Sequence, residues 1–178
     1  MIDWEDFPIR TPRQRLDEAK RIIGVKSMAE FQAEAIKLDE RIDYLFKKYI
    51  INRMKIDIKS MSADALLDRF EEICMVQSEV EHDLFDEGTK RYNECQRALW
   101  RVCDELKERG PDARRMLSRF YNHLNYYVRL KAASYSYRVA PGPARRVLEE
   151  LQKMAPLDEA FAAGSTLASI DDGTSMLD

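Results

Sequence analysis

The sequence predicts an all-α protein built from short antiparallel helix pairs, an arrangement typical of an α-solenoid unit. Apolar residues recur at intervals of three and four through most of the 178 residues, which is the period of an amphipathic helix. Capping residues, glycines and prolines separate these stretches into individual helices. With 45% hydrophobic and 34% charged residues, the composition fits a helix-rich protein with a substantial core.

Residues 1–60 are predicted to form a helical N-terminal extension. Thr11, Pro12 and Gly24 delimit one helix, and Ser27 with Glu30 makes a capping box before the next. That second helix carries an apolar seam, which favours packing in a bundle and would also suit a homodimer. The seam consists of Met28, Phe31, Ala35, Leu38, Ile42, Leu45 and Tyr49. Residues 50–61 are a connector, a continuation of this helix or a short strand.

Residues 61–156 are predicted to form the main helical domain. Ser62 caps a helix that extends to Phe85, Gly88-Thr89 breaks and recaps the chain, and Gly110-Pro111 separates the next two helices. The expected inner faces are Leu66, Phe70, Ile73, Gln77 and Val80 in the first helix, Tyr92, Cys95, Leu99, Val102 and Leu106 in the second, and Met116, Leu117, Phe120, Tyr121 and Leu124 in a helix over residues 111–124.

Two more helices are predicted before an acidic C-terminal tail. The first covers residues 126–139 and ends at Pro141-Gly142-Pro143, because proline cannot continue the hydrogen-bond ladder. Its inner side is expected to hold Val128, Ala132, Ala133 and Tyr137, and the helix over residues 143–154 contributes Ala144, Val147, Leu148 and Leu151. Residues 157–178 are expected to be a polar tail that is partly ordered at most.

The C-terminal two thirds of the chain carry a family likeness. The segments "SADALLDRFEEI", "RYNE", "CDELKERG", "HLNYYVRLKAASYSYRVAPGPARRVLEEL" and "AGSTLASIDDG" follow one another in order. This succession resembles the small bacterial family known as domain of unknown function twenty-nineteen, over about residues 62–173. "NYYVRLKAASYSY" also resembles the second helix of a HEAT-like repeat. The resemblance implies a HEAT-like all-α superhelix, and some small proteins of this type are presumed immunity proteins encoded beside secreted bacterial toxins.

Composition and motifs favour a cytoplasmic, non-enzymatic protein without a cofactor. The N-terminus lacks the basic start and apolar stretch of a signal peptide, and three scattered cysteines do not form a disulfide framework. Glu79-x-x-His82 is a single metal-type motif, which His123 alone cannot complete. Cys74, Cys95 and Cys103 have no zinc spacing and are expected to be buried small hydrophobes. No glycine-rich phosphate loop is present in the sequence.

Charge is distributed unevenly along the chain. Residues 71–89 hold seven acids and no lysine or arginine, whereas residues 107–153 hold eleven bases and four acids, a net charge of +7. Carboxylates suit a basic protein partner, such as a toxin that itself binds phosphate. Tyrosines interleaved with arginines suit a protein hot spot or, alternatively, nucleic acid. A weaker third option is an enzyme that acts on DNA bases.

We therefore expect a protein-binding module, most consistent with an immunity protein that neutralises a cognate toxin. The expected partner-binding residues are Glu79, Glu81, Asp83, Asp86, Glu87, Tyr126, Tyr127 and Arg129. The alternative is a nucleic-acid-binding helical-repeat protein that uses the basic, tyrosine-rich residues 107–153. The sequence predicts neither a membrane span nor a metal site.

Overall fold

The computed structural model describes residues 43–44, 46–51, 57–81 and 86–174, together with Ile36 and Glu40. The chain divides into two compact units, Met1–Asp43 and Tyr44–Asp178, and the second contains all the elements considered below. Ile36 and Glu40 are helical, and the rest of the helices predicted before residue 43 lies outside the described residues. In the described part every regular element is a helix, so the all-α prediction is confirmed there.

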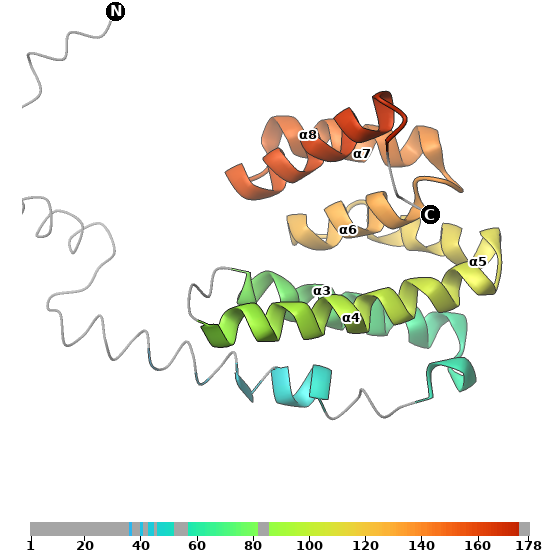
Figure 1. The fold of residues 1–178 in the computed structure, drawn as a ribbon. Helices are drawn as coiled ribbons and strands as arrows, with labels where there is room; N and C mark the ends of the chain where they lie inside the picture. Colours follow the sequence, from blue (N-terminus) through green and yellow to red (C-terminus); the bar gives the residue numbers. More distant parts are fainter. Residues whose placement is uncertain are drawn as a thin grey trace, which may run out of the picture. The chain divides into compact units, whose positions relative to one another are not determined.

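The second unit begins with two short elements and continues with a run of helices (Figure 1). The π-helix η2 covers Lys47–Ile51 and the 3-10 helix η3 covers Ile58–Ser60. The remaining elements are α3 (Ala63–Val80), α4 (Asp86–Glu108), α5 (Pro111–Arg115), the 3-10 helix η4 (Met116–Phe120), α6 (Tyr126–Ser136), α7 (Pro141–Met154) and α8 (Leu157–Asp171). None of the described helices is long and apolar enough to cross a bilayer.

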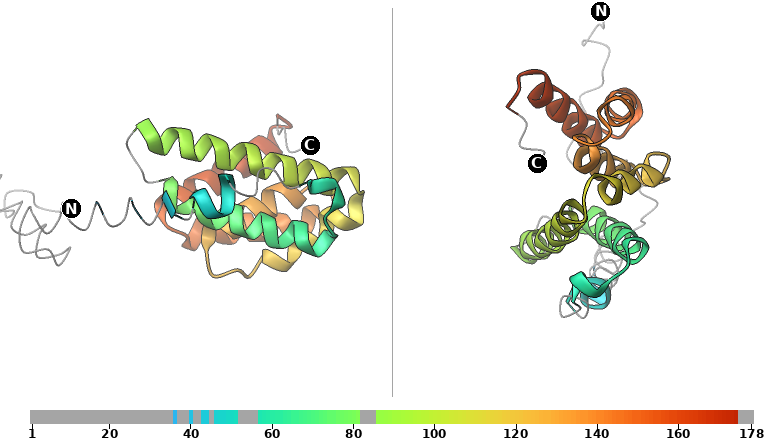
Figure 2. Two further views of the ribbon diagram at one scale, coloured as in Figure 1. Left: turned by 90° about the horizontal axis from the view of Figure 1, so that it is seen from below. Right: turned by 90° about the vertical axis from the view of Figure 1, so that its right-hand side faces the viewer.

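Successive helices pack as antiparallel pairs. Helix α3 packs on α4, η4 packs on α6, and α7 packs on α8, while α6 also contacts α3, α7 and α8. Seen end on in the right panel of Figure 2, the α3–α4 pair, the middle layer with α6 and the α7–α8 pair follow one another. Helix α6 is therefore the central element that joins the first pair to the last.

The predicted inner faces of α3 and α4 are confirmed. Leu66, Phe70, Ile73 and Gln77 are fully buried and Val80 is nearly so. On α4, the side chains of Cys95, Leu99, Val102 and Leu106 are buried, and Tyr92 is half-buried. Ser62 caps α3 as predicted, because its side chain accepts a hydrogen bond from the backbone N–H of Ala65 at 3.1 Å.

The chain between the first two helices differs from the prediction. Helix α3 ends at Val80 rather than at Phe85, and α4 begins at Asp86 and passes through Gly88 and Thr89 without a break. A glycine inside a helix costs only about 1 kcal/mol relative to alanine. The packing of α4 along α3 outweighs that cost.

The predicted helix over residues 111–124 is wrong beyond its first turn. Helix α5 ends at Arg115 and a 3-10 helix follows to Phe120. Residues three apart align in a 3-10 helix, so Arg114, Leu117 and Phe120 share the buried side. Met116 is 36% exposed and Leu124 is 95% exposed, although the α-helical spacing placed both inside.

The last part of the chain is more ordered than predicted. Helix α6 ends at Ser136 rather than residue 139, and Pro141 is the first residue of α7, a position where its missing N–H has no helical partner to lose. The expected polar tail from residue 157 is instead helix α8, which buries Ala163 and Leu167. Those two side chains sit one turn apart and supply the packing that orders this segment.

Candidate protein-binding surface at one end of the helix pairs

The antiparallel arrangement gathers three connections at one end of the second unit. The C-terminal end of α3, the N-terminal ends of α4 and α6, and the α7–α8 junction all lie on the left in Figure 1. Segments far apart in the sequence therefore meet there. We call the group formed by Glu79, Glu81, Leu124, Asn125 and Tyr126 the loop-end surface.

Direct contacts hold the loop before α6 against the end of α3. Asn125 donates a side-chain hydrogen bond to Ser78 Oγ at 3.1 Å. His123 Nε2 lies 3.1 Å from Glu71 Oε1, and the backbone N–H of Asn125 donates to His123 Nδ1 at 3.1 Å. Since Nδ1 accepts, the neutral ring carries its proton on Nε2 and donates it to Glu71.

Asn125 also starts α6. Its side-chain oxygen accepts hydrogen bonds from the backbone N–H groups of Tyr127 at 2.8 Å and Val128 at 3.2 Å, which satisfies two donors at the helix terminus. The extended backbone of Asn125 turns the chain into the helix. The loop is thus fixed on both sides of Leu124.

Leu124 is the most exposed large hydrophobic residue among the described ones, at 95%. Its neighbours His123 and Asn125 are both held by hydrogen bonds, so an apolar side chain is presented in a defined place. The α-helical spacing predicts Leu124 in the core, so this surface position was not expected. The signal that would have identified it is the flanking "YNHLN", because asparagines favour turns and helix starts over helix interiors.

The predicted partner-binding residues come together only in part. Glu81 is exposed, and Glu79, Tyr126 and Arg129 are half-buried. Tyr127 is 2% exposed and therefore belongs to the core. Asp83 and the side chains of Asp86 and Glu87 lie outside the described part of the chain.

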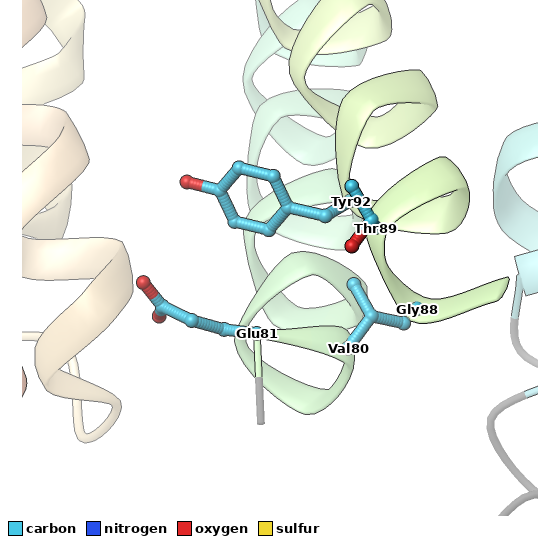
Figure 3. A pocket seen from close by; sticks show the side chains of 5 residues that line it. All are labelled: Val80, Glu81, Gly88, Thr89 and Tyr92. Atoms are coloured by element: carbon cyan, nitrogen blue, oxygen red, sulfur yellow. The ribbon is translucent and has the colours of Figure 1, made fainter. Parts of the chain in front are cut away.

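A cavity of about 220 Å³ opens between the end of α3 and the start of α4. It is lined by Val80, Glu81, Gly88, Thr89 and Tyr92. The Glu81 carboxylate and the Tyr92 hydroxyl extend to the same side of the hairpin (Figure 3). Tyr92 accepts a hydrogen bond from Tyr127 at 3.4 Å. Burial raises the pKa of Tyr127, and the contacts with Tyr92 and the charge of Glu81 raise it further.

Most cations of the basic segment have partners within the chain. Arg119 lies 3.4 Å from Asp64 and 3.0 Å from Asp68. Arg129 donates to the backbone oxygen of Tyr121 at 2.8 Å and pairs with Glu150 at 3.1 Å. Arg145 bonds both oxygens of Asp171, at 2.7 and 3.1 Å, and Glu149 at 2.9 Å.

Tyrosine hydroxyls of the same segment are used internally as well. Tyr121 and Ser136 lie 2.6 Å apart between their hydroxyl oxygens, and Tyr135 accepts a hydrogen bond from Gln96 at 3.1 Å. Burial raises the pKa of both tyrosines. The positive charge and aromatic content of residues 107–153 therefore serve largely to join the helices.

The three cysteines are buried, as the sequence predicted. Burial raises the pKa of Cys95 to about 12 and also raises the pKa of Cys74 and Cys103, which disfavours the reactive thiolate. Among the residues that the structure describes, no three His, Cys, Asp or Glu side chains form a group suited to a metal ion. His82 of the Glu79-x-x-His82 motif lies outside them.

The second unit and its loop-end surface define a small all-helical domain of antiparallel helix pairs. Residues 64–171 match the family described as "Domain of unknown function (DUF2019)", and the chain belongs to this family. The resemblance to domain of unknown function twenty-nineteen is therefore confirmed.

A solved structure supports the same fold. The chain is similar to the protein RPA1889 from Rhodopseudomonas palustris CGA009, with 32% identity and a TM-score of 0.60. The match covers 68% of this chain and 98% of that one. A comparison with curated proteins gives no match.

Proposed function

We propose that the protein is a non-enzymatic binding module whose loop-end surface receives a basic protein partner. The observation that carries this proposal is Leu124, which is 95% exposed between two residues held by hydrogen bonds. Because hydrogen bonds already order the loop on both sides of Leu124, burying this side chain against a partner requires little further ordering of the backbone.

The charge around Leu124 favours a basic partner. Asn125 donates a hydrogen bond to Ser78, and Glu79 is the next residue along α3. Glu81, two residues after Glu79, is exposed. Carboxylates at the rim of an interface accelerate association with a positively charged protein and disfavour acidic ones. A toxin whose active surface binds phosphate has the required charge.

An immunity-type role follows from this chemistry together with the family resemblance. The module would bind its cognate toxin in the cytoplasm and occlude the toxin's active surface. We also propose that the helix pairs α3–α4, η4–α6 and α7–α8 form a HEAT-like superhelix, which the successive packing of the pairs supports. The internal ion pairs of Arg119, Arg129 and Arg145 favour protein binding over nucleic-acid binding, because paired cations release fewer counterions from phosphate.

The first experiment captures partners with the tagged full-length chain in its native host, after nuclease treatment. Three variants accompany it: Leu124→Asp, the double variant Glu79→Lys with Glu81→Lys, and a control with Asp104→Lys and Glu108→Lys. The control makes the same charge change near the opposite end of α4. We expect a stoichiometric partner with the wild type and the control, and its loss with the other two variants.

The captured partner is then titrated by calorimetry. As the hot spot of the proposed interface, Leu124 should contribute about 2 kcal/mol or more, which predicts at least about a thirtyfold weaker Kd for Leu124→Asp. Equal affinity of this variant and the control would overturn the proposal. Recovery of RNA or DNA without nuclease, in place of a protein, would favour the nucleic-acid alternative.

A further inference from the structure

Helix α8 has two apolar faces, and only one of them is covered. Ala163 and Leu167 point into the unit and are buried. On the other side, Leu157 is 83% exposed and Phe161 is 76% exposed, and Met154 at the end of α7 adds a third large side chain at 60%. Burial of Ala163 and Leu167 explains why α8 folds onto the unit. It does not explain why the outer face of α8 carries large apolar side chains.

The outer face is a continuous uncharged stripe. Leu157, Phe161, Ser165 and Ala168 are all exposed, and their spacing of four, four and three residues places them on one side of the helix. No charged residue occurs between Glu159 and Asp171. We call these four residues the α8 stripe.

Such a stripe is unfavourable at the free end of a run of stacked helices. Terminal helices of such arrays need a polar outer face for solubility, and contiguous exposed apolar patches mark interaction sites. The outer side of α8 has the apolar character of a helix inside a stack and lacks the polar character of a terminal helix. A further helix packed on this side would remove the large side chains from water.

The α8 stripe is complementary to itself. Its N-terminal half carries the large residues Leu157 and Phe161, and its C-terminal half carries the small residues Ser165 and Ala168. In an antiparallel pair of two α8 helices, Phe161 of one copy lies over Ser165 of the other, and Leu157 lies over Ala168. Both pairings share a midpoint close to Ala163, so one two-fold axis satisfies them together.

The charges at the two ends of α8 are compatible with this pairing. It brings Asp158 and Glu159 of one copy toward Asp171 of the other. The carboxylate of Asp171 is already held by Arg145 through two hydrogen bonds of 2.7 and 3.1 Å. The Arg145 charge therefore offsets the repulsion that two acidic ends would otherwise produce.

We propose that the α8 stripe is a homodimer interface, in which α8 packs antiparallel against α8 of a second copy about a two-fold axis. The interface is about 16 Å long between Leu157 and Ala168 at 1.5 Å per residue. An interface of this length buries little surface, so we expect a dimer with a Kd of about micromolar order. The inference is independent of the proposed toxin partner, because it uses a different set of residues.

Sedimentation equilibrium of the full chain tests the dimer. We expect the wild type to dimerise, Phe161→Asp to weaken the dimer at least tenfold, and Leu124→Asp to leave it unchanged. Circular dichroism confirms that each variant is folded, and Phe161→Ala serves as a milder second variant. A wild type that remains monomeric up to a concentration of about 100 µM would overturn the proposal.

Disulfide trapping tests the orientation. The native cysteines are buried, so introduced surface thiols can be followed without removing them. An antiparallel pair predicts efficient cross-linking when Phe161→Cys chains are mixed with Ser165→Cys chains, and less cross-linking in either variant alone. Stronger self-cross-linking of Phe161→Cys would indicate another geometry and contradict the proposal.

A last variant separates this interface from the apolar seam predicted in residues 28–49. If Leu38→Asp abolishes the dimer and Phe161→Asp does not, the seam is the interface and the α8 proposal is wrong. Loss of the dimer only with Phe161→Asp supports it. Binding of the captured partner to a monomeric Phe161→Asp chain would leave the proposed function intact and show that the two surfaces act separately.

Discussion

At the residue scale, one asparagine connects local structure to the candidate surface. Asn125 accepts from two backbone N–H groups of α6, donates to Ser78 on α3 and offers its own N–H to His123. These bonds fix the loop that carries Leu124. Asparagine is among the best helix N-caps because its short side chain reaches the first-turn donors. A helix start at this position was therefore predictable, whereas the contact with Ser78 was not.

The first prediction concerns this cap. Asn125→Ala removes the acceptor of two helix-start donors and should lower the free energy of unfolding by about 1 to 2 kcal/mol. Asn125→Asp keeps the capping oxygen but loses the bond to Ser78, so it should lie between the wild type and the alanine variant. Urea unfolding followed by circular dichroism gives the order. Equal stability of the alanine and aspartate variants would contradict the role assigned to the cap.

At the scale of elements, the main differences between sequence and structure occur where a helix changes type or length. The α-helical period described α3, α4 and α7 well because their buried faces follow intervals of three and four. It failed for residues 116–124, because a 3-10 helix over Met116–Phe120 aligns residues three apart and the chain leaves the helix before Leu124. It also failed for residues 157–171, because a helix rich in Ala, Ser and Gly has little contrast between its faces.

Two glycines give a matched prediction at this scale. Gly164 lies within α8, and an added Cβ would meet Gln152 Nε2 at 3.0 Å, the flexible end of an exposed side chain. Gly164→Ala should therefore raise the free energy of unfolding by up to about 1 kcal/mol through helix propensity. Gly110 has a φ of 101°, a backbone conformation that costs a residue other than glycine about 1 to 3 kcal/mol.

Gly110→Ala should accordingly destabilise the protein. Thermal and urea unfolding of the two variants provide the comparison, and the signs of the two changes should be opposite. If Gly164→Ala destabilises the chain, Gln152 does not move aside, and the packing between α7 and α8 is tighter than inferred here.

At the scale of the whole molecule, the core of the second unit joins the α3–α4 pair to η4 and α6. Phe70 of α3 stacks on Phe120 of η4, with ring centroids 5.6 Å apart, and meets the edge of Tyr135 of α6 at 6.4 Å. The buried thiols of Cys74, Cys95 and Cys103 belong to the same core. Ionisable groups buried in their neutral form couple the stability of the unit to pH.

The third prediction follows from this coupling. The pKa of each buried thiol and of Tyr127 is raised by burial, so the folded chain retains protons that the unfolded chain releases. Stability is therefore complete below the unfolded pKa of about 8.5 for cysteine and falls as the pH rises above it. Urea unfolding between pH 7 and pH 10.5 should show this decline. It should be shallower in a chain with the three cysteines replaced by alanine.

Residue patterns alone predicted the helical class, the family, the buried faces of α3 and α4, the cap at Ser62 and the burial of the cysteines. These features depend on residues close together in the chain, where helix period and capping chemistry act directly. The folded unit was needed to show which helix ends meet, which charges are paired, and that Leu124, Leu157 and Phe161 face outward. Those outcomes depend on contacts between residues 20 to 60 positions apart, such as Arg119 with Asp64, His123 with Glu71 and Arg145 with Asp171. Local patterns carry no information about such contacts, because antiparallel packing selects them only after the helices have formed.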